Sequence, residues 1–373
     1  MGVMRILDPT PAEGSDLADP QPDHSSPAIP FPGPMRVLEC CHNALQLYGR
    51  GEAAAWPRRE SWSPEADLEL FMPARLGDWE GFKIIRERPS AEPGRLGTRT
   101  AWMVVRHPPT HRAWRLPADE ITDARTGAAG ILAAAYLSPA EVREASVIGS
   151  GRVAHSIAAY FGTIRKSPIL SRLEGLRSIS IYSQTPARRS DFVGLLQSTL
   201  DIPVREAISV RDAVQSAGVV LIAVASPAPV IEMDDLAPGA HLSALSGSPF
   251  SAALGDTVLL GSDVVVVDQM EQCLRSGEMR ALQEDGRIQS VRFARLDGRP
   301  AHLGDASIGK IPRQDGKNSL AYLSGIALLD LAVGVEWVHE VQQASDETRA
   351  SVRNTAGQEE QILQEIDLWQ PIP

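Results

Sequence analysis

Cysteine is scarce in this sequence, and long apolar runs are missing from it. The 373 residues include 3 cysteines, of which Cys40 and Cys41 are adjacent. Neighbouring cysteines seldom pair and no C-x-x-C spacing occurs, so neither a disulfide framework nor a zinc site is indicated, and we expect no bound metal. No apolar segment reaches the roughly 20 residues of a membrane-spanning helix, and the first residues lack the apolar core of a secretion signal. We therefore expect a protein of the reducing cytoplasm.

Positive charge is also in the minority. The chain carries 36 Lys and Arg against 47 Asp and Glu, which gives a net charge of −11. Because the acidic residues are spread along the chain, we expect neither nucleic acid nor an anionic membrane as a partner. The hydrophobic fraction of 43% suits a globular core, and a chain of this length predicts two domains at roughly 100–200 residues each.

A glycine-containing turn in the middle of the chain is the most informative positive feature. The segment Ala145–Ala154 reads Ala-Ser-Val-Ile-Gly-Ser-Gly-Arg-Val-Ala and predicts a short buried strand, a tight turn and the start of a helix. Gly149 permits the turn, Gly151 lets the backbone approach a phosphate, and the helix N-terminus offers free N–H groups to a dinucleotide pyrophosphate. An ordinary glycine turn between a strand and a helix is the alternative.

The region before this turn predicts a β-rich unit. Residues 9–34 are rich in Pro, Asp and Ser and predict a mobile tail. Helical periodicity follows over Met35–Tyr48. Short strands with mostly antiparallel pairing are then expected between Gly and Pro turns at Leu68–Pro73, Gly81–Arg86, Ala101–Arg106 and His111–Leu116.

From Asp123 onward the pattern changes to alternating helices and strands. A helix of small residues over Asp123–Tyr136 leads to the glycine turn, and the strands after it lack polar alternation, as expected for strands covered on both faces. Right-handed crossovers then predict a doubly wound parallel sheet of the Rossmann type. A polar loop over Gly298–Lys317 precedes a final helix over Tyr322–Ala344. The predicted strands are Ser146–Ile148, Ser178–Tyr182, Val219–Val224, His241–Leu245 and Val264–Val267, with helices such as Ala187–Thr199 and Val210–Ser216 between them.

Taken in order, several short motifs resemble the ornithine cyclodeaminase/mu-crystallin family of NAD(P)-dependent enzymes. The likeness covers about residues 36–344 and implies a homodimer whose protomer has two domains. It rests on Met72-Pro-Ala, Gly81-Phe-Lys-Ile-Ile, Ile121-Thr-Asp-Ala-Arg-Thr-Gly-Ala-Ala, Ile148-Gly-Ser-Gly, Ser183-Gln-Thr-Pro-Ala-Arg, Pro238-Gly-Ala-His and Gly325-Ile-Ala-Leu-Leu-Asp.

The resemblance also assigns the domains. It implies an α/β protein with a tail at 1–34, a substrate-binding and dimerisation domain of α+β type at 35–128 and 320–350, and a dinucleotide-binding domain at 129–319. A polar tail follows at 351–373, where Glu359–Ile366 forms a candidate terminal helix.

Family chemistry implies three basic residues around a substrate carboxylate. Arg58 matches a carboxylate-binding arginine, although neighbouring Arg59 leaves the register open. Lys83 and Arg125 are the expected catalytic residues: Lys83 for proton transfer, Arg125 for bridging substrate and cofactor phosphate. Solvated surface charges are the alternative for all three. Asp330 either faces the cofactor or forms a hydrogen bond within the core.

The implied dinucleotide contacts surround the glycine turn. A carboxylate that would repel a 2′-phosphate is missing at Ser183, and Arg188 and Arg189 follow it, so we favour NADP(H) while NAD(H) stays open; solvated arginines on a helix face are the alternative. The expected contacts are Thr98, Arg125, Thr126, Gly149, Ser150, Gly151, Arg152, Val153, Ser183, Gln184, Thr185, Arg188, Ala225, Leu245 and Ser324.

Two family acids are not found in this sequence. Ser248, an expected substrate contact, stands at or near the position of an aspartate that handles the substrate amine, and Leu70 replaces a second acid, with Glu69 on the opposite strand face. Ornithine cyclodeamination is therefore disfavoured. We expect an oxidoreductase acting on the C–N bond of an α-imino or α-amino acid in a specialised biosynthetic pathway. The segment Asp268–Cys273 resembles the siderophore 2,3-diaminopropionate dehydrogenase branch. Ammonia elimination from a diamino acid and a catalytically silent NADP-binding protein are the alternatives.

Overall fold

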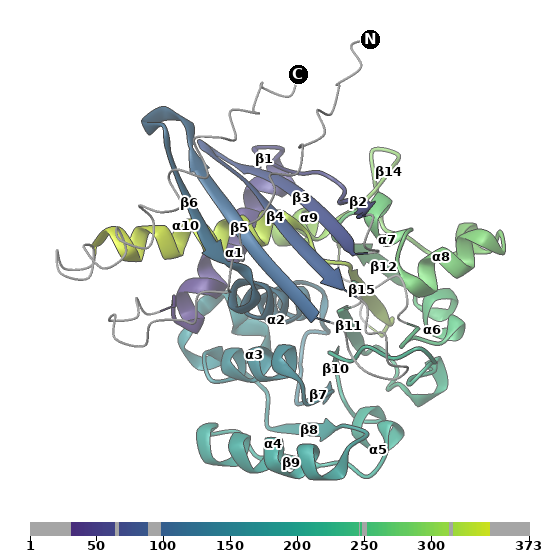
Figure 1. Ribbon diagram of the computed structural model, residues 1–373. Helices are drawn as coiled ribbons and strands as arrows, with labels where there is room; N and C mark the ends of the chain where they lie inside the picture. Colours follow the sequence, from purple (N-terminus) through teal and green to yellow (C-terminus); the bar gives the residue numbers. More distant parts are fainter. Residues whose placement is uncertain are drawn as a thin grey trace.

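The computed structural model describes residues 31–63, 67–88, 98–245, 247, 252–312 and 316–343. Two sheets dominate it, one parallel and one antiparallel (Figure 1). Residues 1–30 of the expected N-terminal tail, the C-terminal tail with the terminal helix at Glu359–Ile366, and Ser248 lie outside the described residues, as do the side chains of Thr98 and Arg99. The last residues of the expected N-terminal tail are described: Phe31 contacts the Trp337 ring, and Pro34 begins the first helix.

The larger sheet has seven strands in the order β12-β15-β11-β10-β7-β8-β9, all of them parallel. Alternate side chains of its strands enter two different cores, because successive residues of a strand point to opposite faces. In β10, Val219 and Leu221 join one core, and Val220 and Ile222 join the other. Both faces are therefore covered, which confirms the expected doubly wound sheet. The strands are β7 (Glu144–Ile148), β8 (Ser178–Tyr182), β9 (Val204–Glu206), β10 (Val219–Ile222), β11 (His241–Leu245), β12 (Val264–Val267) and β15 (Ser319–Leu323).

Helices from different parts of the chain cover the two faces. The first core takes residues from a set of helices between residues 118 and 199, and the second takes residues from the helices after β9. Short 3-10 turns connect several elements. The first set is α2 (Ala118–Leu137), α3 (Arg152–Phe161) and α4 (Pro186–Thr199); the second is α5 (Val210–Val214), α6 (Asp256–Gly261), α7 (Met270–Cys273) and α8 (Gly277–Glu284).

The smaller sheet has six strands in the order β1-β3-β4-β5-β6, with β2 paired to β3, and all its pairings are antiparallel. Helix α1 (Pro34–Arg50) and the last helix, α10 (Ala327–Gln343), lie behind this sheet in Figure 1. Gly81 of β4 and Gly334 of α10 allow the helix and sheet to approach closely. The strands are β1 (Ala53–Ala55), β2 (Arg59–Trp62), β3 (Leu68–Leu76), β4 (Trp79–Arg88), β5 (Thr98–His107) and β6 (Arg112–Pro117).

The end of the chain differs from the expectation. The predicted helix over Tyr322–Ala344 was wrong at its start, because residues 319–323 form β15, which lies between β12 and β11. A five-residue apolar run fits a buried strand and a buried helix equally well. Gly325, with φ of 86°, then separates the strand from α10.

The predicted polar loop was also wrong in part. It contains β14 (Arg299–Pro300), which pairs with β13 (Arg295–Leu296) just before the loop, and the buried helix α9 (Leu303–Ser307). Asp305 is fully buried and meets the Arg299 guanidinium through two bonds of 2.7 and 2.8 Å. This polar segment can be buried because the charges of Arg299 and Asp305 neutralise each other. Strands β1, β2 and β9 were not predicted.

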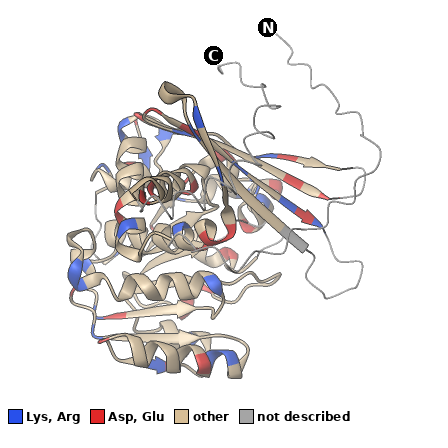
Figure 2. Ribbon diagram, turned by 60° about the vertical axis from the view of Figure 1, so that its left-hand side comes forward, with Lys and Arg blue, Asp and Glu red and all other residues tan. Residues whose placement is uncertain are grey.

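The expected domain boundaries stay predictions. Helix α2 runs across the boundary at 128/129 and β15 across the one at 319/320. Figure 2 shows basic and acidic residues interspersed along the ribbon. In the part of the chain described here, no helix has both the length and the hydropathy of a membrane span.

Candidate active site between the two sheets

A buried cluster of three charged side chains joins the antiparallel sheet to α2 and α10. Lys83 Nζ lies 2.7 Å and Arg125 Nε 3.1 Å from the same oxygen, Oδ1 of Asp330. The side chains of Lys83 and Asp330 are fully buried, and that of Arg125 is 7% exposed. Burial alone would raise the pKa of Asp330, but the charges of Arg125 and Lys83 outweigh it and hold that pKa below its usual value.

The second carboxylate oxygen of Asp330 is buried and has no hydrogen-bond partner among the described residues. Lys83 Nζ also contacts Thr122 Oγ1 at 3.3 Å. The structure therefore brings the two predicted catalytic residues together on a carboxylate that the sequence left unassigned. Asp330 could be recognised only after β4 and α10 had been placed face to face.

Arg58 lies directly before β2 and is 4% exposed, whereas Arg59, the first residue of β2, is exposed. Its Nε donates to Glu60 Oε1 at 2.8 Å, and its Nη1 donates to the Gly247 carbonyl at 2.7 Å. Its Nη2 is buried without a hydrogen-bond partner in the described part of the chain. A buried guanidinium nitrogen in this condition is a vacant donor for an anion.

The Ser324–Gly325 turn after β15 connects Arg58 to the charged cluster. A Cβ at Gly325 would lie 2.6 Å from Arg125 Nη1, so glycine is required for this approach as well as for its positive φ. The buried Gln272 amide donates to the Gly325 carbonyl and accepts from the Arg58 N–H at 3.2 Å. One turn and one amide thus bring Arg58 and Arg125 to the same segment of the chain.

Asp268 holds the same turn from the end of β12. Its carboxylate accepts from the Ser324 N–H and hydroxyl at 3.1 and 2.9 Å and from the Gly325 N–H. The sequence had singled out Asp268–Cys273 only as a family likeness. Its position directly after a buried parallel strand could have indicated a role at the site, because ligands bind at the carboxyl ends of such strands.

The glycine turn after β7 has the expected geometry. Gly149 has φ of 129°, and a Cβ there would lie 2.4 Å from the Ala223 carbonyl oxygen. Gly151 is the N-cap of α3, and a Cβ on it would have no atom within 4 Å. Ser150 Oγ and Ser183 Oγ are 2.8 Å apart, which brings the ends of β7 and β8 together.

Several other predicted contacts lie near this turn. Arg152 pairs with Asp123 of α2 at 2.8 Å, and Thr126 Oγ1 donates to the Thr122 carbonyl at 2.5 Å, so neither side chain is free. Val153 is half-buried. Thr98 lies at the start of β5, paired with Arg88 at the far end of β4.

The remaining predicted contacts follow the strand ends. Gln184, Thr185 and Arg188 are exposed before and within the first turn of α4, and Ala225 is exposed after β10. Leu245 ends β11 and lies against Gly130 of α2.

Arg189 differs from Arg188, because it is committed to other protein groups. Its Nε donates to Glu206 Oε1 at 2.7 Å and its Nη1 to the Ser183 carbonyl at 2.8 Å. Arg188 has no ion pair among the described residues, and it is therefore the available cation after β8.

Leu70 and Glu69 occupy opposite faces of β3, as expected. Leu70 is 7% exposed in the core, and Glu69 forms an ion pair with Arg86.

Several known enzymes are similar to this chain in sequence. An alanine dehydrogenase of Archaeoglobus fulgidus is 24% identical over 303 residues, covering 80% of this chain and 87% of that protein. An ornithine cyclodeaminase of Brucella suis is 28% identical over 255 residues, 67% of each chain. An N-((2S)-2-amino-2-carboxyethyl)-L-glutamate dehydrogenase of Staphylococcus aureus is 23% identical over 286 residues, covering 74% of this chain and 80% of that protein.

Solved structures share the fold. The Δ1-pyrroline-2-carboxylate reductase of Thermococcus litoralis, solved with NADH and L-proline, superposes with a TM-score of 0.71 at 19% identity and covers 84% of this chain and 94% of its own. An archaeal alanine dehydrogenase dimer with bound NAD gives a TM-score of 0.71 at 22% identity, covering 84% and 93%.

The sequence pattern of one family covers nearly the whole described chain. It matches residues 35–345. The expectation of an NAD(P)-dependent oxidoreductase of this type is confirmed at the level of the family, and with it the expectation of a nicotinamide cofactor. The chain belongs to the ornithine cyclodeaminase/mu-crystallin family.

Proposed function

We propose that this protein catalyses hydride transfer between NADP(H) and the carbon of a C–N bond in an α-imino or α-amino acid. The observation that carries the proposal is the buried, vacant Nη2 of Arg58 beside the turn that Arg125 also contacts. A buried polar group without a partner costs about 1–3 kcal/mol, and a substrate carboxylate would satisfy it. Relatives that act on amino acids, such as the alanine dehydrogenase, are consistent with this substrate class.

The glycine turn fits a dinucleotide. A side chain at Gly149 would clash with the Ala223 backbone, so only glycine fits there. The space beside Gly151, at the N-terminus of α3, is open. Backbone N–H groups and the helix dipole there suit a pyrophosphate. When bound, the nicotinamide supplies or accepts the hydride.

We assign the chain's own residues as follows. Arg58 and Arg125 hold the substrate carboxylate. Lys83 forms an ion pair with Asp330, and it donates a proton to the substrate nitrogen or receives one from it, directly or through water. Asp330 positions Lys83 and Arg125 and does not itself touch the substrate.

The reaction is tested with the purified protein, NADPH, and imines formed from α-keto acids and amines. We expect dinucleotide oxidation with an imine, and we expect Lys83→Met to lower kcat/KM by about 10²–10⁴-fold, as for loss of a positioned proton-transfer group. Lys166→Met, which removes an exposed lysine, is the control and should change nothing.

Two results would contradict this assignment. Ammonia release from a diamino acid without net change in the dinucleotide would indicate cyclodeaminase chemistry. Dinucleotide binding with no turnover across the panel would indicate a silent binding protein.

We further propose a preference for NADPH. Ser183 places no carboxylate at the end of β8, and Arg188 is the available cation, whereas Arg189 is held by Glu206. Arg188→Ala should lower kcat/KM with NADPH about tenfold, the effect of roughly 1.4 kcal/mol, and leave NADH unchanged. Arg165→Ala, at an exposed arginine beyond α3, is the control. A wild-type preference for NADH would defeat the proposal.

We also propose a homodimer formed through the outer face of the antiparallel sheet. This face, turned away from α1 and α10 in Figure 1, carries apolar side chains at neighbouring register positions. Phe82 contacts Phe71 at 5.1 Å between ring centroids, and Ile84 stands opposite Trp102. Such a patch is typical of a protein–protein contact.

The cytoplasmic setting stays a prediction, consistent with three free cysteines.

A further inference from the structure

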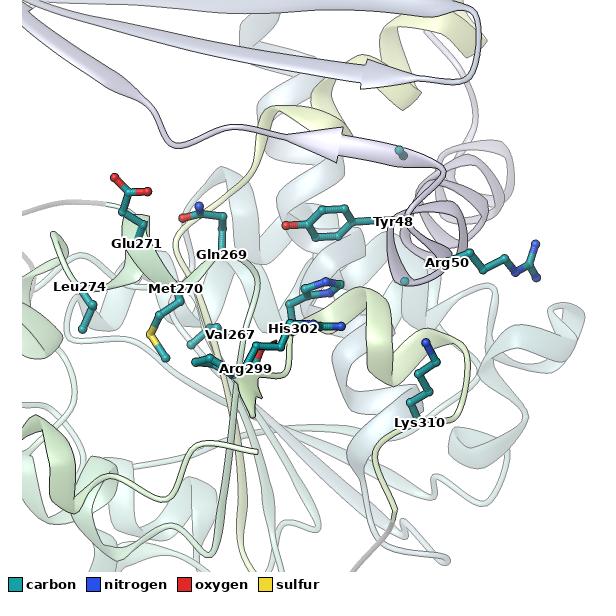
Figure 3. A pocket seen from close by; sticks show the side chains of 14 residues that line it. Tyr48, Arg50, Val267, Gln269, Met270, Glu271, Leu274, Arg299, His302 and Lys310 are labelled. Atoms are coloured by element: carbon teal, nitrogen blue, oxygen red, sulfur yellow. Dashed lines mark hydrogen bonds between the residues drawn. The ribbon is translucent and has the colours of Figure 1, made fainter. Parts of the chain in front are cut away.

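A cavity lies outside the site described above. It has a volume of about 760 Å³ and is bounded by the end of α1, the start of β1, α7 and the segment from β14 to α9 (Figure 3). None of Arg58, Lys83, Arg125, Ser324 or Asp330 lines it. Its function is therefore not explained by the reaction proposed above.

The charges around this cavity favour an anion. Arg299 is neutralised by Asp305, and Glu271 pairs with Arg275 at 2.9 Å. Arg50 and Lys310 line the same cavity and have no ion pair among the described residues. Two uncompensated cations therefore remain.

The cavity also offers an apolar and aromatic wall. Tyr48 stacks on His302 with ring centroids 4.2 Å apart and an interplanar angle of 21°. Met270 of α7 and Leu274, directly after this helix, line the opposite side (Figure 3). An apolar wall with a few placed polar groups is the usual composition of a small-molecule site.

Helix α7 touches both the cavity and the candidate active site. Gln269 and Met270 line the cavity. Asp268, directly before them, holds the Ser324–Gly325 turn, and Gln272, two residues after Met270, is bonded to both Arg58 and Gly325. A ligand that contacts Gln269 and Met270 therefore contacts the same short segment that positions Arg58, the proposed carboxylate-binding arginine.

We propose that this cavity binds a small organic anion, a carboxylate or phosphate with an apolar body, and that its occupancy changes the affinity of the active site for the amino-acid substrate through α7. The binding step is independent of the proposed function, and the kinetic effect rests on it. The shared chemistry is an anionic head held by Arg50 and Lys310 with an apolar body against Tyr48 and Met270.

Binding is measured by calorimetry on the full chain saturated with dinucleotide. Phenylacetate and phenyl phosphate are the probes and distinguish the two head groups; benzyl alcohol is the neutral analogue. We expect at least one anion to bind, the alcohol to bind at least tenfold more weakly, and Arg50→Ala/Lys310→Ala to weaken anion binding about tenfold or more, as for loss of charge-assisted hydrogen bonds. The matched control, Arg165→Ala/Lys166→Ala, removes the same charge from an exposed segment and should leave binding intact.

The link through α7 is measured on the same proteins. Bound anion should change KM for the substrate at least twofold without changing dinucleotide affinity, and the Arg50→Ala/Lys310→Ala protein should lose this response while its basal rate stays unchanged. Failure of all anions to bind, equal binding of the alcohol, equal binding by the double variant, or competition with the substrate would overturn the site. Binding with no change in KM would overturn the link. Absence of turnover in every protein with intact anion binding would instead count against the proposed reaction.

Discussion

His241 begins β11 with no exposed surface, and both of its ring nitrogens meet serine hydroxyls. Nε2 lies 3.0 Å from Ser243 Oγ and Nδ1 lies 2.8 Å from Ser319 Oγ. Ser243 also donates to the Gly130 carbonyl at 2.8 Å, and Ser319 also donates to the Leu137 carbonyl at 3.2 Å. Burial lowers the pKa of the His241 ring to about 3, so the ring is neutral near pH 7.

This residue makes stability depend on pH. The ordinary pKa of 6.5 applies when the chain is unfolded, so the unfolded state binds more protons between pH 6.5 and 3. The stability contributed by neutral His241 is present above pH 6.5 and is lost as the pH falls. Between pH 7.5 and 5.5 the wild type should lose about 1.4 kcal/mol more of its free energy of unfolding than His241→Asn. Chemical denaturation at the two pH values measures this, and parallel losses in both proteins would contradict it.

Single residues of the active site could be predicted unequally. Lys83 and Arg125 were predicted from family motifs, and the structure brings them together. Asp330 was left open, because a lone acid on an apolar helix reads alike whether it meets cations or backbone. Gln272 escaped prediction because its four-residue helix shows no periodicity and its partners lie in distant segments.

Helices α1 and α9 cross where two glycines meet. A Cβ on Gly49 would lie 2.2 Å from the Gly304 carbonyl oxygen, and one on Gly304 would lie 2.8 Å from the Gly49 nitrogen. The contact is between backbones, which cannot rotate away as a side chain can. The glycine pair therefore sets how close α9 comes to the core.

The substitution Gly49→Ala tests how much this backbone contact contributes to stability. Helix propensity alone would favour the substitution by up to about 1 kcal/mol, but overpacking against backbone costs about 1–3 kcal/mol or more. We expect net destabilisation in thermal or chemical unfolding. Gly194→Ala in α4, where a Cβ would have no neighbour within 4 Å, is the matched control and should be neutral or stabilising. Equal stability of both variants would refute the packing argument.

Apolar strands between clear turn or helix signals could be predicted, whereas the shortest strands and β15 could not. The parallel strands β8, β11 and β12 have the predicted bounds, because runs without polar alternation are typical of strands buried on both faces. β15 was missed, and its last two residues were predicted as helix, since its pairing with β11 and β12 depends on distant segments. The three-residue strands β1 and β9 carry too little pattern to be recognised.

At the scale of the molecule, the antiparallel sheet has one face packed on helices and one apolar face turned outward. Val104 of that outer face is 6% exposed, while Phe82 and Ile84 are half-buried. A second copy of the chain is the proposed cover for this patch.

The substitution Phe82→Asp tests whether a second copy of the chain covers this patch. A charge at the centre of an apolar interface should raise the dimer dissociation constant at least about 100-fold, as for loss of an interface hot spot, and yield a monomer by light scattering or sedimentation. Leu195→Asp, at a residue of α4 that is 45% exposed, is the control and should keep the oligomeric state. A monomeric wild type, or a Phe82→Asp protein that stays dimeric, would overturn the proposed dimer.

Helix α2 has a mechanical consequence for the whole protein. Arg125 reaches Asp330 from this helix, Gly127 lies against Ser156 and Ile157 of α3, and Gly130 lies against Leu245. A straight helix rises about 1.5 Å and turns about 100° per residue, so α2 fixes the position of Arg125 relative to the contacts of Gly127 and Gly130. Inserting one residue after Arg125 would rotate its guanidinium by about 100° relative to those contacts and break the ion pair with Asp330, so the length of this segment is constrained by packing at one end and by charge at the other.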